Sequence, residues 1–559
     1  MQWRKKWWQK EVVYQIYPRS FKDSNSDGNG DINGITEKLK YLSNLGVTMI
    51  WICPIFKSPM VDNGYDISSF EEINPMFGTL SDLDKLIATA KQLNIKVMLD
   101  LVINHTSDEH EWFKKALKYP NSKYRDYYIF KSSQNGNRPN NWRSLFGGSV
   151  WEPVPGENTF YFHSFHKKQP DLNWETPELR NEIYNIVNWW LNRGISGFRL
   201  DSITFLKKNQ SFKSFPSDGN DGLVSCTKGT RNQPGLDIFL KELNKKTFSK
   251  HNCITVGEAP GVKYSQLDDF IGDNGYFSMI FDFHYADIDV ESGSEWWKRT
   301  DWTVKDFKRL LFRSQDALQL AGWGANFIEN HDQPRALSKY IQDPKYQNAI
   351  GAKALAAMYF FLRGTPFIYQ GQELGMHNST RSSIKEFDDV SSVDNYRRAV
   401  KEGFDHVQAL QFVNLRSRDN TRTPFPWNIL KNAGFSEANP WLSLTEGYQD
   451  LNCEEESAQK DSVLNFYKKM IQLRNSSENS EELVYGDIHE LTEIPNEVIG
   501  YVRGSKQHFY SYTNLSSSSI SIKISFKAKV LLNNYPSLNL ENQKLKLKPY
   551  QTVLLKEER

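Results

Sequence analysis

Two charged residues, two positions apart in an apolar stretch, offer the first chemistry in this sequence. The stretch GFRLDSI (197–203) carries Arg199 and Asp201. Because residues two apart in a β-strand point to the same face, a cation and a carboxylate would lie side by side at one strand end. The cation would keep Asp201 ionised and able to attack an electrophile. A buried structural ion pair is the alternative interpretation of this stretch.

Other strand-like stretches also end in polar or charged residues. A mouth lined with several carboxylates suits glycoside hydrolysis, which needs a nucleophile and a general acid. A metal site built from His and Asp side chains is the competing interpretation, but HTSDEH (105–110) is not HExxH and no Cys/His cluster supports zinc. The groups at these strand ends are Asp100, His105, Glu258, Asn330, His331 and Asp332.

Strands and helices that alternate along the chain would position these groups. Such alternation indicates a parallel sheet with crossover helices, and eight units of this kind predict an α/β fold, a closed (β/α)8 TIM barrel. The active site of such a barrel lies at the carboxyl ends of its strands. The predicted strands are 12–18, 47–54, 95–102, 197–203, 253–259, 276–283, 325–332 and 364–373, and predicted helices include 35–46, 80–93, 176–193 and 235–248.

A loop near the amino terminus has the pattern of a cation site. In DSNSDGNGD (23–31), oxygen-bearing side chains occupy alternate positions and Gly28 permits a sharp bend. A loop can wrap Ca²⁺ or Mg²⁺ in this way, although Gly34 stands where an EF-hand needs glutamate. A turn rich in Asx residues, with no metal, is the alternative. The candidate ligands are Asp23, Asn25, Asp27, Asn29 and Asp31.

Composition restricts the class of protein. The 559 residues suffice for two or three domains, and 69 Lys and Arg against 67 Asp and Glu leave a charge of +2. This balance argues against nucleic-acid or membrane partners. The four scattered cysteines, the lack of an apolar run in MQWRKKWWQK (1–10), and the lack of about 18 consecutive apolar residues elsewhere predict a cytoplasmic protein. We expect a monomer or weak homo-oligomer.

Eight motifs give the chain a family resemblance that covers nearly its whole length. Through them it resembles the α-amylase superfamily of glycoside hydrolases. The nearest branch contains oligo-1,6-glucosidases, α-glucosidases, dextran glucosidases and sucrose isomerases. The motifs are DNGYD (62–66), DLVINH (100–105), QPDLNW (169–174), GFRLD (197–201), VGEA (256–259), ENHD (329–332), YQGQELGM (369–376) and RDNTRTP (418–424).

The resemblance implies catalytic roles for residues at the strand ends. Asp201 matches the family's nucleophile, Glu258 its general acid/base, and Asp332 the acid that stabilises the transition state. Arg199 matches the arginine that orients the nucleophile. Loop 23–31 resembles the family's Ca²⁺ or Mg²⁺ loop, and no organic cofactor is expected.

The resemblance also implies residues that bind the terminal glucose of a small oligosaccharide. His105 and His331 match histidines bound to its hydroxyls, and Tyr65 resembles a stacking platform. Asp62 and Arg418 resemble a pair that closes the pocket behind this sugar, and Arg422 is the less favoured partner of Asp62. Phe165 stands where the family has another pocket aromatic, and Gln169 lies in the matching QPDLNW motif.

The resemblance divides the chain into a barrel and two additions. Barrel domain A would comprise 1–104 and 176–480, with an irregular insertion at about 374–455. Residues 105–175, after strand three, would form domain B. Short alternating stretches in 481–559 predict a C-terminal antiparallel β-sandwich.

These matches predict a retaining, exo-acting α-glucosidase that hydrolyses terminal α-linked glucose from short isomaltose-, maltose- or sucrose-type substrates. Ser202 stands where relatives that prefer α-1,6 bonds typically have Val, which argues against strict isomaltase behaviour. FHYADIDVES (283–292) lacks the RLDRD motif of sucrose isomerases, and 207–234 would lie near the leaving-group side, where specificity is set. The preferred linkage, the chain length and the identity of the ion stay open.

Three alternatives remain. A sucrose isomerase or transglucosylase, or a trehalose-type disaccharide hydrolase, would use the same site. A non-catalytic transporter subunit or scaffold is disfavoured, because such relatives usually lose one of the three acids that this chain keeps.

Overall fold

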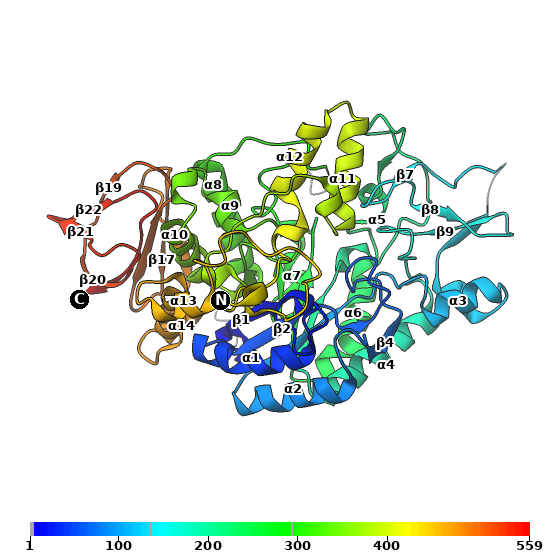
Figure 1. Ribbon diagram of the computed structural model, residues 1–559, viewed down its shortest axis with the longest axis horizontal. Coiled ribbons are helices and arrows are strands. Elements are labelled where there is room, and N and C mark those ends of the chain that lie inside the picture. Colours follow the sequence, from blue (N-terminus) through cyan, green and yellow to red (C-terminus); the bar gives the residue numbers. More distant parts are fainter. Residues whose placement is uncertain (1–4, 133–135, 292–294, 559) are drawn as a thin grey trace.

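The computed structural model describes residues 5–132, 136–291 and 295–558, and a closed barrel of parallel strands forms its centre (Figure 1). Strand β1 pairs with both β2 and β15, which closes the ring. The predicted (β/α)8 barrel is therefore confirmed. In ring order the strands are β1 (Val13–Ile16), β15 (Thr365–Tyr369), β14 (Gly324–Asn326), β13 (Met279–Phe281), β12 (Ile254–Glu258), β10 (Gly197–Leu200), β5 (Lys96–Leu101) and β2 (Met49–Ile52).

Helices surround the barrel, and local signals fix where they begin. Helix α1 (Ile32–Leu45) begins before the predicted residue 35, because Asp31 accepts a hydrogen bond from the backbone N–H of Gly34 and caps the helix. Helix α2 (Leu80–Gln92) opens with a capping box. The other helices around the barrel are α4 (Pro177–Arg193), α6 (Leu236–Lys246), the short α7 (Leu267–Phe270), α8 (Val304–Ala321), α10 (Ala349–Phe360) and α14 (Val463–Asn475).

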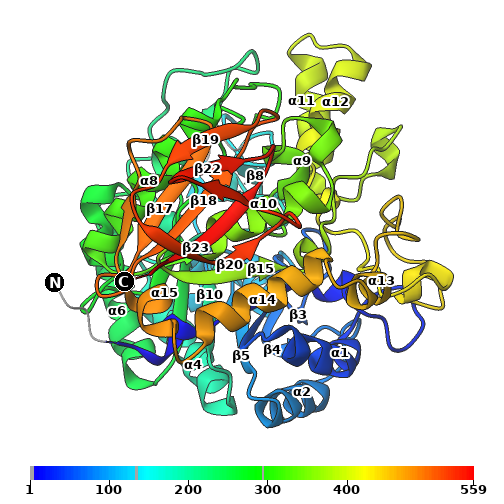
Figure 2. The same ribbon diagram turned by 90° about the vertical axis from the view of Figure 1, so that its left-hand side faces the viewer.

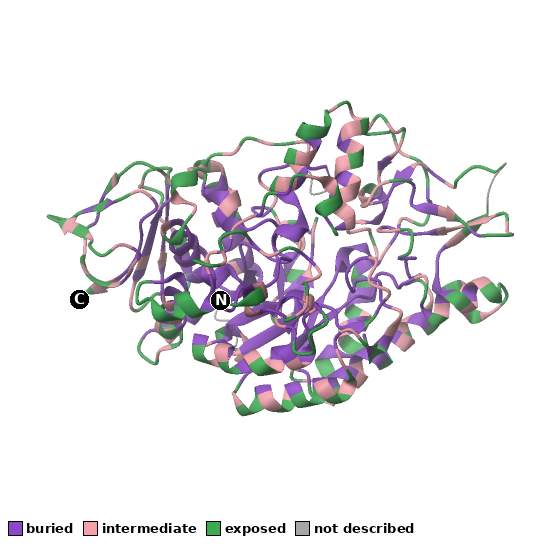
Figure 3. Cartoon of the chain, in the orientation of Figure 1, coloured by how far each residue is buried: buried purple, intermediate pink, exposed green. Residues whose placement is uncertain are grey.

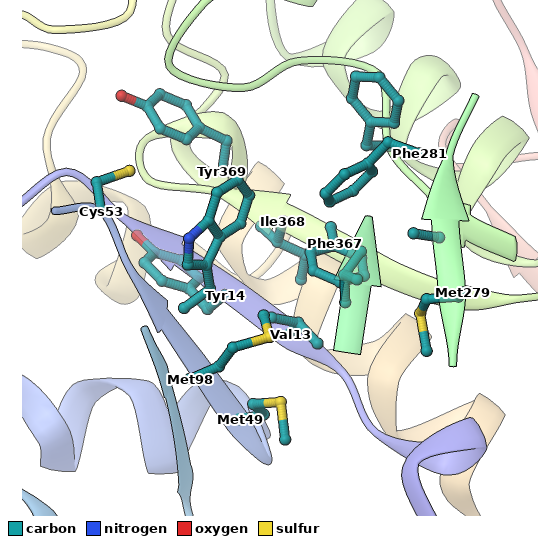
Figure 4. Packing of buried hydrophobic residues seen from close by; sticks show 14 of the residues in the cluster. Val13, Tyr14, Met49, Cys53, Met98, Met279, Phe281, Phe367, Ile368 and Tyr369 are labelled. Atoms are coloured by element: carbon teal, nitrogen blue, oxygen red, sulfur yellow. The ribbon is translucent and has the colours of Figure 1, made fainter. Parts of the chain in front are cut away.

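Apolar side chains fill the barrel, and Figure 4 shows part of this packing. Met49, Met98, Met279 and Phe281, from the three strands β2, β5 and β13, are each at most 2% exposed. Burying a side chain of this size contributes roughly 1.5–3 kcal/mol. Figure 3 shows the same pattern for the whole chain, with buried strands and α10 at the centre and exposed outer helix faces. The packed barrel thus gives the polar residues after each strand a rigid base.

Domain B lies between β5 and α4, at the right of Figure 1. It contains α3 (Glu111–Lys118) and an antiparallel sheet of β6 (Phe130–Ser132), β9 (Thr159–Phe162) and β8 (Trp151–Pro153). Its strand β7 (Trp142–Arg143) pairs with β11 (Val224–Ser225), which follows β10 in the chain. The two segments share one hydrophobic cluster, which contains Ile129, Trp142, Val150, Trp151, Phe162, Phe212, Val224 and Cys226.

The insertion after β15 is more regular than expected. It contains a hairpin of two helices, α11 (Val390–Lys401) and α12 (His406–Arg416), at the top of Figure 1, and later the short α13 (Cys453–Ala458). The expectation of an irregular segment fails there because α11 is a polar helix, in which the buried residues are Ser392, Asn395 and Ala399. Its apolar residues, Val390, Val393, Tyr396 and Val400, recur at helical spacing but stay half-buried, so they do not mark a stripe that faces the core.

The C-terminal domain is the predicted antiparallel sandwich, and Figure 2 shows it facing the viewer. The Arg503 guanidinium donates to the carbonyl of Phe361, next to α10, and thereby ties the sandwich to the barrel. One sheet contains β16 (Ile488–Glu490), β17 (Val498–Arg503), β18 (Phe509–Asn514), β23 (Thr552–Glu558) and β20 (Lys527–Asn533), and the other contains β19 (Ile520–Lys523), β22 (Lys544–Leu547) and β21 (Asn539–Glu541).

Two further properties bear on the sequence-based expectations. Within the described ranges, every helix is too short or too polar to cross a membrane. The four cysteines are free thiols, and three of them are buried.

Candidate active site

One arginine joins the acids at the carboxyl ends of three neighbouring strands. The parallel register sets Arg199 beside Asp100 on β5 and Val256 on β12. Its Nη1 donates to Asp201 Oδ1 at 2.6 Å and to Asp100 Oδ1 at 2.7 Å. Its Nη2 lies 2.9 Å from Glu258 Oε2. A single buried guanidinium therefore fixes the positions of three carboxylates.

The carboxyl group of Glu258 is held in a place that favours its protonated form. The backbone N–H of Ser202 donates to Oε2 at 2.9 Å, and Ser202 has a left-handed φ of +46° that aims this N–H. Burial raises the pKa of Glu258 to about 7, and the charges of Asp201 and Asp332 add to the rise while Arg199 opposes it. Glu258 can thus keep its proton near neutral pH.

Asp201 loses its proton before Glu258 does. Burial raises the pKa of Asp201 to about 6, against the opposing charge of Arg199, and Asp100 adds to the rise. Because the charge of Asp201 acts on Glu258, the protonation of one carboxyl group depends on that of the other. The order of their pKa values is that of a nucleophile beside a proton donor.

Asp332, after β14, is held as an anion by two arginines. Its Oδ1 accepts from Arg422 Nη2 at 2.9 Å and from Arg418 Nη1 at 3.3 Å. Although burial raises the pKa of Asp332, its interactions with His331, Arg418 and Arg422 bring it well below the usual range. Burial lowers the pKa of His331 to about 3, so its ring is neutral at pH 7. The two guanidinium groups therefore supply the charge that stabilises the Asp332 carboxylate.

The inner end of the pocket is closed by ion pairs. Arg418 Nη2 lies 2.9 Å from Asp62 Oδ1, and its Nε donates to Asp389 Oδ1 at 2.8 Å. Gln169 Nε2 donates to the second oxygen of Asp62 at 3.0 Å. Arg422 contacts Asp332 and not Asp62 in the described structure. The pair proposed from the sequence, Asp62 with Arg418, therefore stands across the back of the pocket.

Aromatic and histidine side chains form the sides of the pocket. His105 Nε2 lies 3.1 Å from the Tyr65 carbonyl oxygen and 3.2 Å from Gln169 Nε2, and its ring contacts that of Phe165. The Tyr65 ring stacks on His331 at 5.4 Å between centroids, and its hydroxyl lies 2.5 Å from His331 Nε2. The predicted sugar-binding residues thus converge on the space next to the acids.

The pocket also contains residues that the sequence analysis did not assign to it. Asp389 does not line the cavity but pairs with Arg418, which does, and it had a detectable signal, because it precedes α11 and accepts from the N–H groups of Ser391 and Ser392 as a helix cap. Of the lining residues, Ser391 lies in α11 and Arg416 ends α12, and the others lie on loops with no periodic pattern. The cavity has a volume of about 230 Å³, and its lining adds Phe146, Ser202, Pro260, Phe283, Asp287, Trp296, Gln333, Ser391 and Arg416 to the predicted residues.

The loop 23–31 has a donor set that suits a hard cation, with three carboxylates and two amides. Asp23 accepts from three backbone N–H groups and from the Ser436 hydroxyl. Burial raises the pKa of Asp23, but these hydrogen bonds more than offset it and leave it below the usual value. Among the residues described, no three His, Cys, Asp or Glu side chains gather around one point. The loop contains linked Asx turns, and its ion stays a prediction.

Comparisons with known proteins agree on one family. The model "Alpha amylase, catalytic domain" matches residues 15–486. Probable oligo-1,6-glucosidase 3 of Bacillus subtilis (strain 168) is 44% identical over 509 residues, which are 90% of each chain. Oligo-1,6-glucosidase of Bacillus cereus is 38% identical over 560 residues, or 99% of each chain.

Solved structures with the same fold cover the whole chain. Isomaltulose synthase from Klebsiella sp. LX3 superposes with a TM-score of 0.93 at 37% identity, over 99% of this chain and 100% of the other. Trehalose-6-phosphate hydrolase from Bacillus licheniformis superposes with a TM-score of 0.90 at 37% identity, over the same shares.

Proposed function

The chain belongs to the α-amylase family of glycoside hydrolases, and from this premise we propose that it is a retaining, exo-acting α-glucosidase. It would release terminal α-linked glucose from short oligosaccharides. One observation carries the proposal. Arg199 holds Asp201 and Glu258 together at the open side of a pocket whose inner end Asp62 and Arg418 close. The names of the relatives, several of them oligo-1,6-glucosidases, support the same conclusion.

In the first step, Asp201 attacks the anomeric carbon of the bound glucose. The carbon–oxygen bond to the leaving sugar breaks as Glu258 donates its proton to that oxygen. The product is a leaving sugar and a β-glucosyl ester on Asp201. Retention requires carboxyl groups about 5–5.5 Å apart, and a shared guanidinium favours such a short separation.

In the second step, water enters where the leaving sugar was. Glu258, now a carboxylate, takes a proton from this water as the water oxygen attacks the anomeric carbon. The ester bond to Asp201 breaks, and α-glucose leaves. Asp332 stays ionised through both steps because Arg418 and Arg422 hold it, so its charge can stabilise the developing oxocarbenium ion. Glu258 ends the cycle protonated.

The closed pocket determines which end of a substrate can react. The buried hydrogen-bonding groups of Asp62, Gln169, His105 and Arg418 would bind the hydroxyls of one terminal glucose. Because these groups also end the pocket, a longer chain cannot extend beyond that sugar. The enzyme would therefore act on non-reducing ends and leave internal bonds intact.

A glucosyl-enzyme can also be resolved by a sugar in place of water. Sucrose isomerisation and transglucosylation are thus two alternatives. Trehalose-type hydrolysis, which water completes, is a third. An isomaltulose synthase and a trehalose-6-phosphate hydrolase are 37% and 38% identical to this chain. The test is a panel of isomaltose, maltose, sucrose and trehalose, with the first product followed by proton NMR. We expect α-glucose as the first free anomer. Initial β-glucose would overturn the retaining mechanism, and an isomer of sucrose as the main product would establish the isomerase.

We further propose that loop 23–31 binds Ca²⁺ or Mg²⁺ as a structural ion, supported by its oxygen-rich donor set. The ion would be held by Asp23, Asn25, Asp27, Asn29 and Asp31.

A cytoplasmic location is proposed on the four free thiols, which suit a reducing compartment. We also propose a monomer or weak oligomer, which light scattering across a concentration series would test.

A further inference from the structure

The open side of the pocket has a charge arrangement that the catalytic mechanism does not use. If glucose occupies the closed end beside Asp62, the leaving group must lie on the opposite side, beyond Glu258. This placement rests on the proposed function. The wall on that side comes mainly from the loop after β13 and from the end of α12, and it includes Phe283, Asp287, Trp296, Gln333 and Arg416.

Asp287 is the acid that this wall presents to the leaving group. Its side chain is 31% exposed, whereas that of its partner Arg416 is 3% exposed. Arg416 Nη2 lies 2.9 Å from Asp287 Oδ1, and Gln333 Nε2 donates to the same oxygen at 3.2 Å. Burial raises the pKa of Asp287, but the charges of Arg416 and Lys339 outweigh this effect and bring the pKa below its usual value. The group is therefore an anion at neutral pH.

Two positive charges at this wall, those of Arg416 and Lys339, already have carboxylate partners. Arg416 donates to Asp289 Oδ1 at 2.6 Å through Nη1, in addition to its bond to Asp287. Lys339, beneath the wall, lies 3.2 Å from Asp289. Among the described residues that line the cavity, the guanidinium groups are those of Arg416 and Arg418, and Arg418 contacts three aspartates.

One more arginine lies near enough to matter. The charge of Arg231 acts on both Asp287 and Glu258. Its guanidinium stands over the Phe205 ring, 5.7 Å from the centroid, and Arg231 is not part of the cavity lining. A ligand in the pocket therefore meets the Asp287 carboxylate before it meets this cation.

We propose that the leaving-group side selects an uncharged sugar and rejects one that carries a phosphate or carboxylate, with Asp287 as the specificity-determining residue. Hydroxyls of a neutral sugar can donate to the exposed Asp287 oxygens. Trp296 and Phe283 give the apolar faces of the sugar a surface to contact. An anionic sugar would face a carboxylate and find each lining guanidinium already paired, and such repulsion is an effective source of specificity.

The test compares leaving groups that differ in charge but little in size. One pair is 4-carbamoylphenyl and 4-carboxyphenyl α-glucoside, and the second is trehalose and trehalose 6-phosphate. For each pair that the wild type cleaves, we expect the kcat/KM of the neutral member to be roughly 100-fold higher than that of the charged member. Equal rates, or faster cleavage of the charged member, would overturn the proposal.

Two variants then assign the effect to one side chain. Asp287→Asn should reduce the preference at least about ten-fold, chiefly through KM, because it removes the charge that faces the leaving group. Asp289→Asn is the matched control, since Asp289 also pairs with Arg416 but does not line the cavity. It should keep the preference, even if its melting temperature falls.

Equal selectivity in the two variants would exclude Asp287 as the determinant. Failure of the wild type on every α-glucoside, the aryl glucosides included, would instead overturn the proposed function, and this inference with it. Fluorimetric melting curves would confirm that both variants are folded.

Discussion

Arg418 Nη2 lies 2.9 Å from Asp62 Oδ1, although 356 positions separate the two residues in the sequence. The two side chains come from opposite walls of the pocket and meet behind the space for the terminal glucose. Asp389 holds the other side of the same guanidinium, so the orientation of Arg418 is fixed before any sugar arrives.

Arg418→Ala should therefore cost about 3–5 kcal/mol of transition-state binding, because it leaves the buried Asp62 and Asp389 charges without their partner. Short substrates should suffer most, since they have few other contacts. The measurement is kcat/KM for a disaccharide and a longer oligosaccharide. Arg418→Lys is the control, because it keeps the charge and loses the forked geometry.

In the wild type, a chain blocked at its non-reducing end should resist cleavage, and equal cleavage of blocked and free chains would indicate an open, endo-acting cleft.

Azide can distinguish the roles of Asp201 and Glu258. In Asp201→Gly, azide can take the place of the missing carboxylate, attack from the β face and give β-glucosyl azide. In Glu258→Ala, azide can attack the glucosyl ester on Asp201 and give α-glucosyl azide. Both variants should lose at least about 10⁴-fold in kcat on a disaccharide. The azide products, identified by NMR from an activated aryl glucoside, should have opposite configurations, and the same configuration from both would contradict the assignment.

The pH dependence of kcat/KM should be a bell with its maximum between about 6 and about 7, where Asp201 is ionised and Glu258 is protonated. The acid limb reports protonation of the nucleophile, and the alkaline limb reports loss of the Glu258 proton. The apparent values belong to the coupled pair. With an aryl glucoside that needs no proton to leave, Glu258→Gln should lack the alkaline limb in a single-turnover experiment. An unchanged alkaline limb would assign it to another group.

The raised pKa of Glu258 also predicts that replacing this acid with a neutral residue stabilises the folded protein at alkaline pH. The pKa of Glu258 is about 7 in the folded protein against an ordinary value of 4.5, so the wild type loses stability as the pH rises from about 4.5 to about 7. Glu258→Gln should therefore be more stable than the wild type at pH 8, by on the order of 1–3 kcal/mol, and not at pH 4.5. Asp332→Asn is the contrasting control. Because the pKa of Asp332 is lowered, that variant should be less stable at neutral pH.

The metal loop can be tested by titration. An ion that binds the folded state alone raises stability by mass action, so the wild-type melting temperature should rise with Ca²⁺ or Mg²⁺ concentration after chelation. Asp27→Ala should lose this dependence, because Asp27 is a candidate ligand whose side chain has described hydrogen bonds to Asn29 alone. Loss of stability without loss of the ion response would show only that the Asx turns matter. A flat wild-type response, with no metal found by elemental analysis, would contradict the site.

The barrel and its acids were predictable because two simple rules act together. Parallel strands carry their side chains to one edge of the sheet, and the polar residues that follow apolar runs mark that edge, as with Asp201 and Glu258. The contacts of Asp389 and Arg422 were not predictable, because they depend on how a long insertion folds back over the barrel. Trp296 and Asp287 lie on a loop whose course no local pattern determines. Helix α11 buries polar and small residues while its apolar residues stay half-buried, so their spacing does not mark a face toward the core.

The shared cluster of domain B and residues 212–226 has a consequence for synthesis on the ribosome. Residues 105–175 cannot complete their own core when they emerge, because Phe212, Val224 and Cys226 are made only after helix α4 and strand β10. The excised segment 105–175 should therefore expose Trp142 and Trp151 and fail to fold by itself. The wall of the pocket that domain B forms can thus complete its fold only after the ribosome has made β10, the strand that precedes the nucleophile Asp201.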